Sequence, residues 1–308
     1  MEFGLWVEPE MINPDSELYR AHPDWALQVA GRPLITARNQ LVLDMGRDDV
    51  RDYLYERLAG LLHELPIDYL KWDHNRDLTA AGERPSFRRQ VLGAYDLLAR
   101  LRANFPAVEI EACAGGGGRI DAGIARFTHR FWTSDNIDAV SRVAIQRGYL
   151  QFFPPELMGS HVGAAPAHAT GRIQTMPFRN HVALPGHFGV ELDLRQLSAH
   201  DLALLGDGIA RYKALRDRLH SGQVWQGDGA DGLLWQAHGS AEALVLLVTR
   251  IDPQTQRHAP GLRLPMLDPA RRYRVGDVEY DGAWLVRHGL ALPPLRGEAG
   301  LVLEVTAL

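Results

Sequence analysis

The feature that most constrains the fold of this chain is a repeated alternation of short apolar segments with helical stretches through its first two-thirds. Six segments have the length and composition of buried strands: Phe3–Glu8, Tyr69–Asp73, Val108–Cys113, Arg130–Asp135, Leu157–Val162 and Phe188–Leu192. Stretches of helical period lie between most of them: Arg47–Leu65, Phe87–Phe105 and Ala139–Phe152. In the first of these stretches, Val50, Leu54, Leu58, Leu61 and Leu62 lie on one helix face. Strand–helix alternation predicts parallel strands and an α/β fold.

The pattern changes near residue 221. A long helix is expected over Ala199–His220, and Ser221 and Gly222 end it. The segments that follow are short and β-like, with Gly, Pro and Asp turns between them: Gly232–Gln236, Leu244–Thr249, Tyr273–Val275, Ala283–Val286 and Leu301–Val305. We therefore expect a parallel α/β domain over residues 1–221 and a small antiparallel β domain over residues 222–308.

Six strand–helix units would suit a doubly wound open sheet, and they are two fewer than an eightfold barrel needs. Polar side chains gather directly after several of the expected strands: Glu8 and Glu10, Asp73 to Arg76, Gly115 to Arg119, Ser134 to Asn136, and His161. Barrel enzymes build their sites at the carboxyl ends of many strands. This placement favours a (β/α)₈ barrel that the chain enters partway round, so that the barrel is incomplete.

Composition excludes several classes of function. Lys and Arg number 33 and Asp and Glu number 38, so the net charge is −5 and no basic run offers a surface to nucleic acid or an anionic membrane. Cys113 is the single cysteine, which leaves no intrachain disulfide. No apolar run has the roughly 18 residues of a spanning helix, and the N-terminus shows no signal-peptide pattern. We therefore expect a cytoplasmic protein.

Two aspartates are the leading candidates for chemistry. Asp73 ends an expected strand, and Lys71 points to the same side, where its charge favours an ionised carboxylate; an ordinary strand-end ion pair is the alternative. Asp135 ends another strand among Thr, Ser and Asn, without a basic partner in sequence, whereas Asp138 has the position of a helix N-cap. Two strand-end carboxylates on different strands suit glycoside hydrolysis, in which one attacks the anomeric carbon and the other protonates the leaving oxygen.

Other features have competing interpretations. The Gly115–Gly118 run allows backbone to approach a ligand closely, but it lacks the spacing of a phosphate-binding loop. Cys113 by itself is read as a buried small hydrophobe, and Arg38 as a solvated loop residue or a clamp for hydroxyl or carboxylate groups. Trp6 shares a side with Glu8 and could form a wall on which a sugar stacks. No metal-ligand spacing and no Gly-x-Ser-x-Gly elbow occurs among the residues, so neither a metal nor a serine nucleophile is expected.

Taken together, five motifs carry a resemblance to a known family. They are FGLWVEPEM (residues 3–11), RNQLVLD (38–44), KWDHNR (71–76), CAGGGGRID (113–121) and WTSDNID (132–138), and MGSHV (158–162) follows them. Over about residues 3–220 the chain closely resembles the α-galactosidases of glycoside hydrolase family 36. The resemblance implies a retaining double displacement in a (β/α)₈ barrel, followed by a C-terminal β-sandwich, with no cofactor.

The resemblance also implies roles for individual residues. Asp73 corresponds to the nucleophile and Asp135 to the general acid/base. The positions that line the galactose pocket are Trp6, Arg38, Lys71, Cys113 and Gly116, and Asn75 and Arg76 are expected to support the nucleophile. Cys113 thereby changes from a buried hydrophobe to a pocket residue near the sugar 2-hydroxyl.

The sequence departs from the family pattern in ways that leave alternatives open. It lacks the family's N-terminal β-sandwich domain, the first two barrel strands and the acidic pair on the second strand, and it has His74 and Ala114 where many members have Met and Ser. The implied substrates are melibiose- and raffinose-type α-galactosides. A galactosyltransferase of the raffinose-synthase type, an α-N-acetylgalactosaminidase and an inactive sugar-binding fragment are the alternatives, and a homo-oligomer is possible.

Overall fold

The computed structural model describes residues 2–79, 86–252 and 260–308, and these form two compact units, residues 1–135 and residues 136–308. The first unit contains the parallel strands β1, β4, β5 and β6 of the incomplete barrel, the second contains β7 and β8, and an antiparallel sheet follows them in the chain. The predicted fold class, an incomplete (β/α)₈ barrel with a C-terminal β domain, is therefore confirmed. No helix in the described ranges combines the length and the apolar character needed to cross a membrane.

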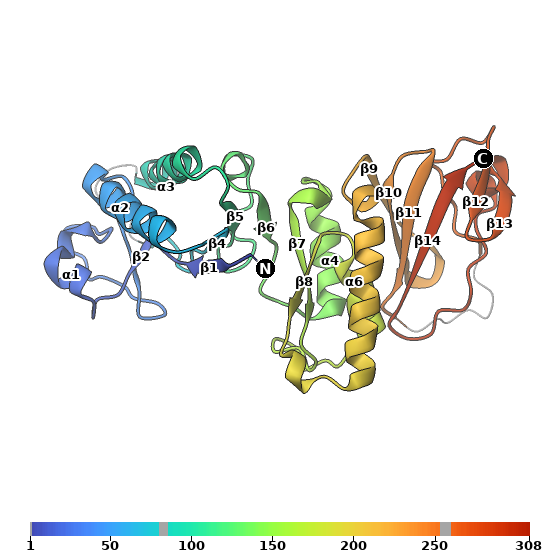
Figure 1. Cartoon of the computed structure of the whole chain (residues 1–308), viewed down its shortest axis with the longest axis horizontal. Helices are drawn as coiled ribbons and strands as arrows, with labels where there is room; N and C mark the ends of the chain where they lie inside the picture. The colour runs from blue at the N-terminus through green and yellow to red at the C-terminus, as the bar shows by residue number, and fades with distance from the viewer. Residues whose placement is uncertain (1, 80–85, 253–259) are drawn as a thin grey trace. The chain divides into compact units, whose positions relative to one another are not determined.

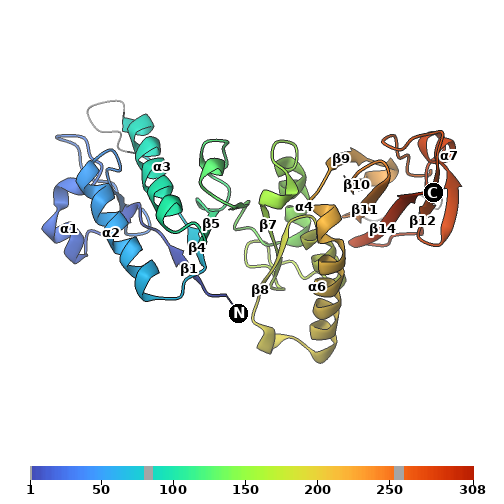
Figure 2. The ribbon, with the colours of Figure 1, turned by 45° about the horizontal axis from the view of Figure 1, so that its top comes forward.

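In the first unit, parallel strands alternate with helices as the sequence predicts. The elements are β1 (Gly4–Val7), α2 (Asp48–Glu64), β4 (Tyr69–Trp72), α3 (Ser86–Asn104), β5 (Glu109–Ala112) and β6 (Arg130–Trp132). Helices α2 and α3 pack side by side on one face of the sheet (Figures 1 and 2). The predicted apolar face of α2 buries Val50, Leu54 and Leu58, but Leu61, one helical turn further on, is 38% exposed.

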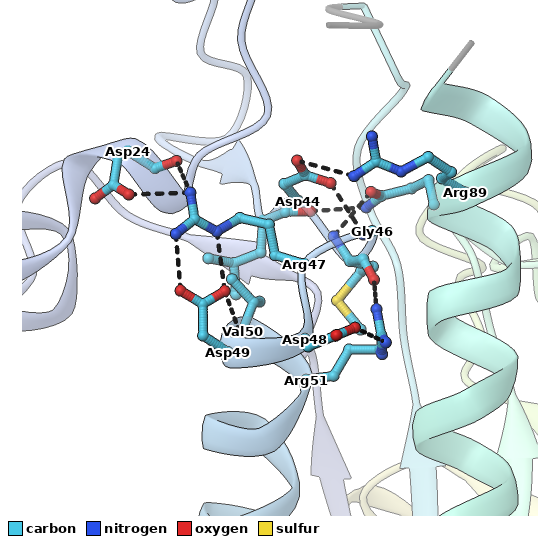
Figure 3. A network of polar contacts seen from close by, with 12 residues as sticks. Asp24, Asp44, Gly46, Arg47, Asp48, Asp49, Val50, Arg51 and Arg89 are labelled. Atoms are coloured by element: carbon cyan, nitrogen blue, oxygen red, sulfur yellow. Dashed lines mark hydrogen bonds and ion pairs between the residues drawn. The ribbon is translucent and has the colours of Figure 1, made fainter. Parts of the chain in front are cut away.

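Charged side chains fix the start of α2 (Figure 3). Arg47 donates to both carboxylate oxygens of Asp49, at 2.7 and 3.0 Å, and forms an ion pair of 3.0 Å with Asp24. The hydrogen bond from Arg47 holds the pKa of Asp49 at about 2. Arg51 donates to the Met45 carbonyl at 2.8 Å and pairs with Asp48. The aspartates in the first turn also suit the positive end of the helix dipole.

A short insertion between β1 and α2 was not predicted from the sequence. It contains β2 (Met11–Ile12), α1 (Glu17–Ala21), the 3-10 turn η1 (Pro23–Trp25) and β3 (Leu41–Val42), and β2 pairs antiparallel with β3. Met11 and Val42 share a small apolar cluster with Leu27. The insertion matters for the site because the residues just before β3 carry Arg38.

The second unit begins with two further parallel strands and their helices. These elements are α4 (Ala139–Tyr149), β7 (Met158–Gly163), α5 (Met176–Ala183), β8 (His187–Glu191) and α6 (Ala199–Leu219), with β7 paired to β8. Asp138 caps α4, since its side chain accepts a hydrogen bond of 3.0 Å from the Val140 amide, as the sequence predicts. Helix α5 was not predicted.

An antiparallel sheet makes up the rest of the second unit. Its strands are β9 (Gln223–Asp228), β10 (Leu233–Gly239), β11 (Ala243–Arg250), β12 (Arg272–Val275), β13 (Val278–Asp281) and β14 (Ala299–Ala307), in the order β13-β12-β14-β11-β10-β9. One face buries a core that includes Trp235, Leu246 and Tyr273. On the other face, Val245 and Leu247 pack with Leu215 and Leu219 of α6.

One predicted strand of the antiparallel part is wrong. The segment Ala283–Val286 belongs to a helix, α7 (Gly282–Arg287), which buries Leu285 and leaves Trp284 53% exposed. A run of four apolar residues fits either structure, and only the packing of this segment decides between them. Strands β9 and β13 were not predicted, because they carry more polar and charged residues than an apolar run.

Candidate active site

The carboxyl ends of β1, β4, β5 and β6 bring most of the predicted site residues to one edge of the first unit's sheet. Strands β1, β4 and β5 pair in parallel, with Trp6 beside Lys71 and Lys71 beside Glu111. Asp73 directly follows β4, Cys113 follows β5, and Asp135 lies three residues beyond β6. The topology thus gathers residues separated by up to about 130 positions in the sequence.

Asp73 is a buried carboxylate surrounded by hydrogen-bond donors. Its Oδ2 accepts from the Trp6 indole at 3.1 Å and from Asn75 Nδ2 at 2.7 Å, and its Oδ1 accepts from the His74 amide at 2.9 Å. Burial on its own raises the pKa of Asp73, but hydrogen bonds from Asn75, the Cys113 thiol, Trp6 and His74 lower it by more. The pKa therefore lies below its usual value, and Asp73 is ionised at neutral pH.

Asn75 links three of the strand ends. Besides its bond to Asp73, its Oδ1 accepts from the Gly115 amide at 3.2 Å, and its own amide donates to Glu8 Oε1 at 3.1 Å. The Asn75 side chain thus ties the loop after β5 to the carboxylate after β4, and its backbone amide adds the loop after β1. This geometry suits the supporting role expected of Asn75, which stays a prediction.

Arg76 is fastened to the loop that precedes β3. It is buried, and its Nη2 donates to the Ile35 carbonyl at 2.6 Å, so this contact holds the loop that precedes β3. The support that Arg76 is expected to give to Asp73 stays a prediction.

Lys71 has a partner that the sequence analysis missed. Its Nζ lies 3.0 Å from Glu111 Oε1 on β5 and 4.7 Å from the centre of the Trp132 ring on β6. Hydrogen bonds from Asn75, Cys113, Trp6 and His74 are the leading causes that lower the pKa of Asp73, and the expectation that Lys71 also favours the ionised form stays a prediction. No local signal could reveal Glu111, because it contacts Lys71 across 40 residues of sequence.

Asp135 is held by its own strand and by the glycine run. Its Oδ1 accepts a hydrogen bond of 3.0 Å from the Trp132 indole. Gly116 has a φ of +83°, and a Cβ placed there would lie 2.7 Å from the Asp135 amide nitrogen and 2.7 Å from Ser134 Cα. The expected close approach of the glycine backbone is therefore an approach to the loop that carries Asp135.

Cys113 is 2% exposed, and its thiol hydrogen-bonds to Asp73. Burial and the neighbouring negative charge of Asp73 raise the pKa of this thiol to about 12. The residue is therefore a protonated donor to the candidate nucleophile at neutral pH, and it is itself a poor nucleophile.

Arg38 sits at the tip of a tight turn. Arg38 and Asn39 have φ values of +52° and +57°, and Ala37 and Gln40 exchange backbone hydrogen bonds of 3.3 and 3.0 Å around them. Gln40 also donates to Glu8 at 2.7 Å, which fastens this turn to the end of β1. Arg38 thereby lines a cavity of about 530 Å³ together with Asn75 and Asp135.

A buried ion pair forms another wall of that cavity. Glu10 is 1% exposed and accepts hydrogen bonds from Arg119 at 2.9 and 3.2 Å and from the Trp72 indole at 2.8 Å. Burial on its own raises the pKa of Glu10, but the charges of Arg119 and His74 and these hydrogen bonds lower it by a larger amount. The pKa of Glu10 therefore lies below its usual value. Among the residues that the structure describes, no cluster of three His, Cys, Asp or Glu side chains could hold a metal ion.

The chemistry open to this site follows from its carboxylates. Asp73 is ionised, fixed by four donors and only 7% exposed, which suits a nucleophile that must meet substrate in one orientation. Asp135 is a second carboxylate, on a different strand end. Such a pair can transfer a glycosyl group through attack by one member and proton transfer by the other.

Comparison with known proteins identifies the family. Residues 1–222 match the Melibiase family model, and residues 235–301 match the glycosyl hydrolase family 36 C-terminal domain. The chain is 41% identical to the alpha-galactosidase of Escherichia coli over 343 aligned residues, which cover 99% of this chain and 48% of that protein.

Solved structures agree along the whole chain. The family 36 alpha-galactosidase AgaB from Geobacillus stearothermophilus is 37% identical with a TM-score of 0.94, covering 100% of this chain and 44% of its own. A variant of AgaA from the same organism, in complex with raffinose, is 36% identical with a TM-score of 0.94, covering 100% and 45%. The chain spans less than half the length of each of these relatives. By its sequence and its fold, the chain belongs to glycoside hydrolase family 36, the melibiase family.

Proposed function

We propose that this chain carries the catalytic residues of a retaining α-galactosidase, which hydrolyses terminal α-D-galactosyl residues of oligosaccharides. The observation that carries the proposal is the Asp73 carboxylate, which four donors keep ionised at the strand edge that also bears Asp135. The raffinose complex of the related AgaA variant supports the choice of raffinose-type substrates.

The proposed reaction has two steps. Asp73 attacks the anomeric carbon while Asp135 gives a proton to the leaving oxygen, so a β-linked galactosyl ester forms on Asp73 and the aglycone departs. Asp135 then takes a proton from water, which attacks the same carbon and releases α-galactose. Two inversions at one carbon retain its configuration, and both steps need only carboxylates and water.

The remaining site residues are proposed to bind the galactosyl group. Lys71 would donate hydrogen bonds to sugar hydroxyls, and the half-exposed Trp6 would pack against the sugar while its indole N–H holds Asp73. Arg38 would reach the substrate from its turn at the cavity wall. Cys113 and the backbone at Gly116 would limit the room beside the 2-hydroxyl.

We also infer that the catalytic part covers residues 1–221 and that residues 222–308 form a separate β domain. The inference is supported by the change from parallel to antiparallel strands between the end of α6 at Leu219 and the start of β9 at Gln223. The family models match on either side of the same region.

Azide rescue tests the assigned roles. Asp73→Gly should abolish turnover of an aryl α-galactoside, and azide should restore it with β-galactosyl azide as the product, because azide would replace one of the two inversions. Asp135→Gly should slow substrates with poor leaving groups much more than activated aryl substrates, since activated groups need little protonation. Formation of the α-azide by Asp73→Gly would show that Asp73 is not the nucleophile.

A further inference from the structure

Glu111 is a buried carboxylate for which the sequence analysis found no role. Its side chain is 4% exposed, and it lies on β5 directly beside Lys71 in the parallel register. A carboxylate without partners is costly to bury, so its contacts account for its presence. Both oxygens contact β4: Oε1 lies 3.0 Å from Lys71 Nζ, and Oε2 accepts a hydrogen bond of 2.6 Å from the Tyr69 hydroxyl.

The ammonium of Lys71 is held from a second direction as well. The Trp132 ring on β6 has its centre 4.7 Å from Nζ, within the range of a cation–π contact. The same indole donates to Asp135 at 3.0 Å. Glu111 and Trp132 thus fix the cation between a carboxylate and an aromatic face, and 26% of the Lys71 side chain stays exposed at the site.

Lysine is rare in this chain. Of the 33 basic residues, only Lys71 and Lys213 are lysines, and the rest are arginines. An ammonium is a compact point charge, whereas a guanidinium is a wider planar fork. The space between Glu111 and Trp132 therefore holds the smaller cation in a chain whose other basic residues, apart from Lys213, are all arginines.

We propose that Glu111 is a positioning residue, which fixes the Lys71 ammonium where it meets the hydroxyl groups of the sugar. Its contact with Lys71 stands on the geometry of β4 and β5 alone, whereas the effect on sugar binding rests on the function proposed above. Glu111 acts through Lys71, so its loss should weaken substrate binding and leave the attack by Asp73 much less affected.

Amine acetylation measures the placement of Lys71 without any need for turnover. A free amine reacts with acetyl N-hydroxysuccinimide and an ammonium does not, and the exposed Lys213 on α6 serves as an internal reference. Removing a carboxylate at hydrogen-bond distance should raise the free-amine fraction of Lys71 by about tenfold or more. Mass spectrometry of Glu111→Gln should show this rise in the ratio of Lys71 to Lys213 labelling.

Two control variants separate positioning from a loosened sheet. Glu109→Gln changes the same strand two residues earlier, where the exposed carboxylate pairs with Arg130, and it should leave the ratio unchanged. Tyr69→Phe removes the other hydrogen bond of Glu111 but keeps the ion pair, so the ratio should rise by less than about threefold. An unchanged ratio in Glu111→Gln, or an equal rise in either control, would overturn the proposal.

Kinetics tests the consequence for the sugar. Glu111→Gln should raise KM for p-nitrophenyl α-galactoside by about tenfold with kcat changed by less than about threefold. In a Lys71→Met background the same substitution should have no further effect, because its effect passes through Lys71. Additive effects of the two substitutions would contradict the positioning role.

Protection of Lys71 from acetylation by galactose tests the proposed function separately from the positioning role of Glu111. If the proposed function is right, a high concentration of galactose should slow the acetylation of Lys71 in the unchanged chain and leave that of Lys213 as it was. Absence of both protection and turnover would refute the proposed function. The labelling ratios of Glu111→Gln and its controls would still decide the role of Glu111.

Discussion

Gly116→Ala should disturb the loop that carries Asp135, and Gly115→Ala is its matched control. Both glycines have positive φ values, +83° and +56°, so both substitutions place an alanine in the left-handed region. The main difference between the two sites is the space around the new Cβ. At Gly116 it would lie 2.7 Å from the Asp135 nitrogen and from Ser134 Cα, whereas at Gly115 its nearest neighbour is Asn75 Oδ1 at 3.9 Å.

The expected cost of each substitution follows from these contacts. A left-handed alanine costs about 1 kcal/mol relative to glycine, and this term is shared by the two variants. A carbon at 2.7 Å is well inside the optimal separation of about 3.5–4.0 Å, and overpacking of this kind costs about 1–3 kcal/mol more. Gly116→Ala should therefore lower the free energy of unfolding by about 2–4 kcal/mol and Gly115→Ala by about 1 kcal/mol.

Urea unfolding followed by tryptophan fluorescence measures the difference. With a slope of about 2 kcal/mol per molar urea, the midpoints of the two variants should differ by about 0.5–1.5 M. Equal midpoints would refute the reasoning, because the approach of Gly116 to the Asp135 loop would then carry no energetic weight. The slopes should agree between the variants, so that the midpoints report stability.

The same pair of variants also reports on catalysis. Relief of the contact requires the backbone at Ser134 and Asp135 to move, and a displacement of about 1 Å in a catalytic group can cost about a hundredfold in rate. Turnover should therefore fall much further in Gly116→Ala than in Gly115→Ala. A similar loss in both would show that Asp135 is insensitive to this loop.

Three further predictions concern titration and reactivity. Burial lowers the pKa of His181 and His238 to about 4, so both histidines are neutral in the folded chain at pH 7. The free energy of unfolding should be fully retained above about pH 6.5 and fall towards pH 4, by about 3 kcal/mol per histidine. Urea midpoints at about pH 7 and about pH 4.5 should show this loss, and the double variant His181→Gln with His238→Asn should reduce it. Asn75→Ala removes a donor that lowers the pKa of Asp73, so the acid limb of the kcat/KM profile should move to higher pH, and an unmoved limb would contradict this role. The Cys113 thiol, with a pKa of about 12, should resist iodoacetamide in the folded chain and react in urea; rapid labelling of the folded chain would contradict its burial.

Features set by local sequence were predictable. All six parallel strands lie within three residues of their predicted ends, because short apolar runs between helical stretches define them. The N-cap role of Asp138 was likewise accessible, since a cap and the amides it meets are neighbours in sequence.

Side-chain contacts between different strands could not be predicted from the sequence. The indole of Trp6 meets Asp73 across 67 residues, and Glu111 meets Lys71 across 40, so neither spacing forms a motif. The sequence therefore named the two candidate aspartates and a supporting role for Asn75, but it gave no sign that the Cys113 thiol and the Trp6 indole donate to Asp73. The prediction of a strand at Ala283–Val286 was wrong for a related reason, because the packing of this segment and not its composition makes it helical.

Release of p-nitrophenol from p-nitrophenyl α-galactoside by the purified chain, with Asp73→Asn as the control, tests the proposed function most directly. The amide has nearly the size of the carboxylate, so it removes the nucleophilic charge with little change in packing. The proposed function predicts turnover by the unchanged chain and none above background by Asp73→Asn. Turnover that persists in Asp73→Asn, or no turnover by a chain whose fold is verified, would contradict it.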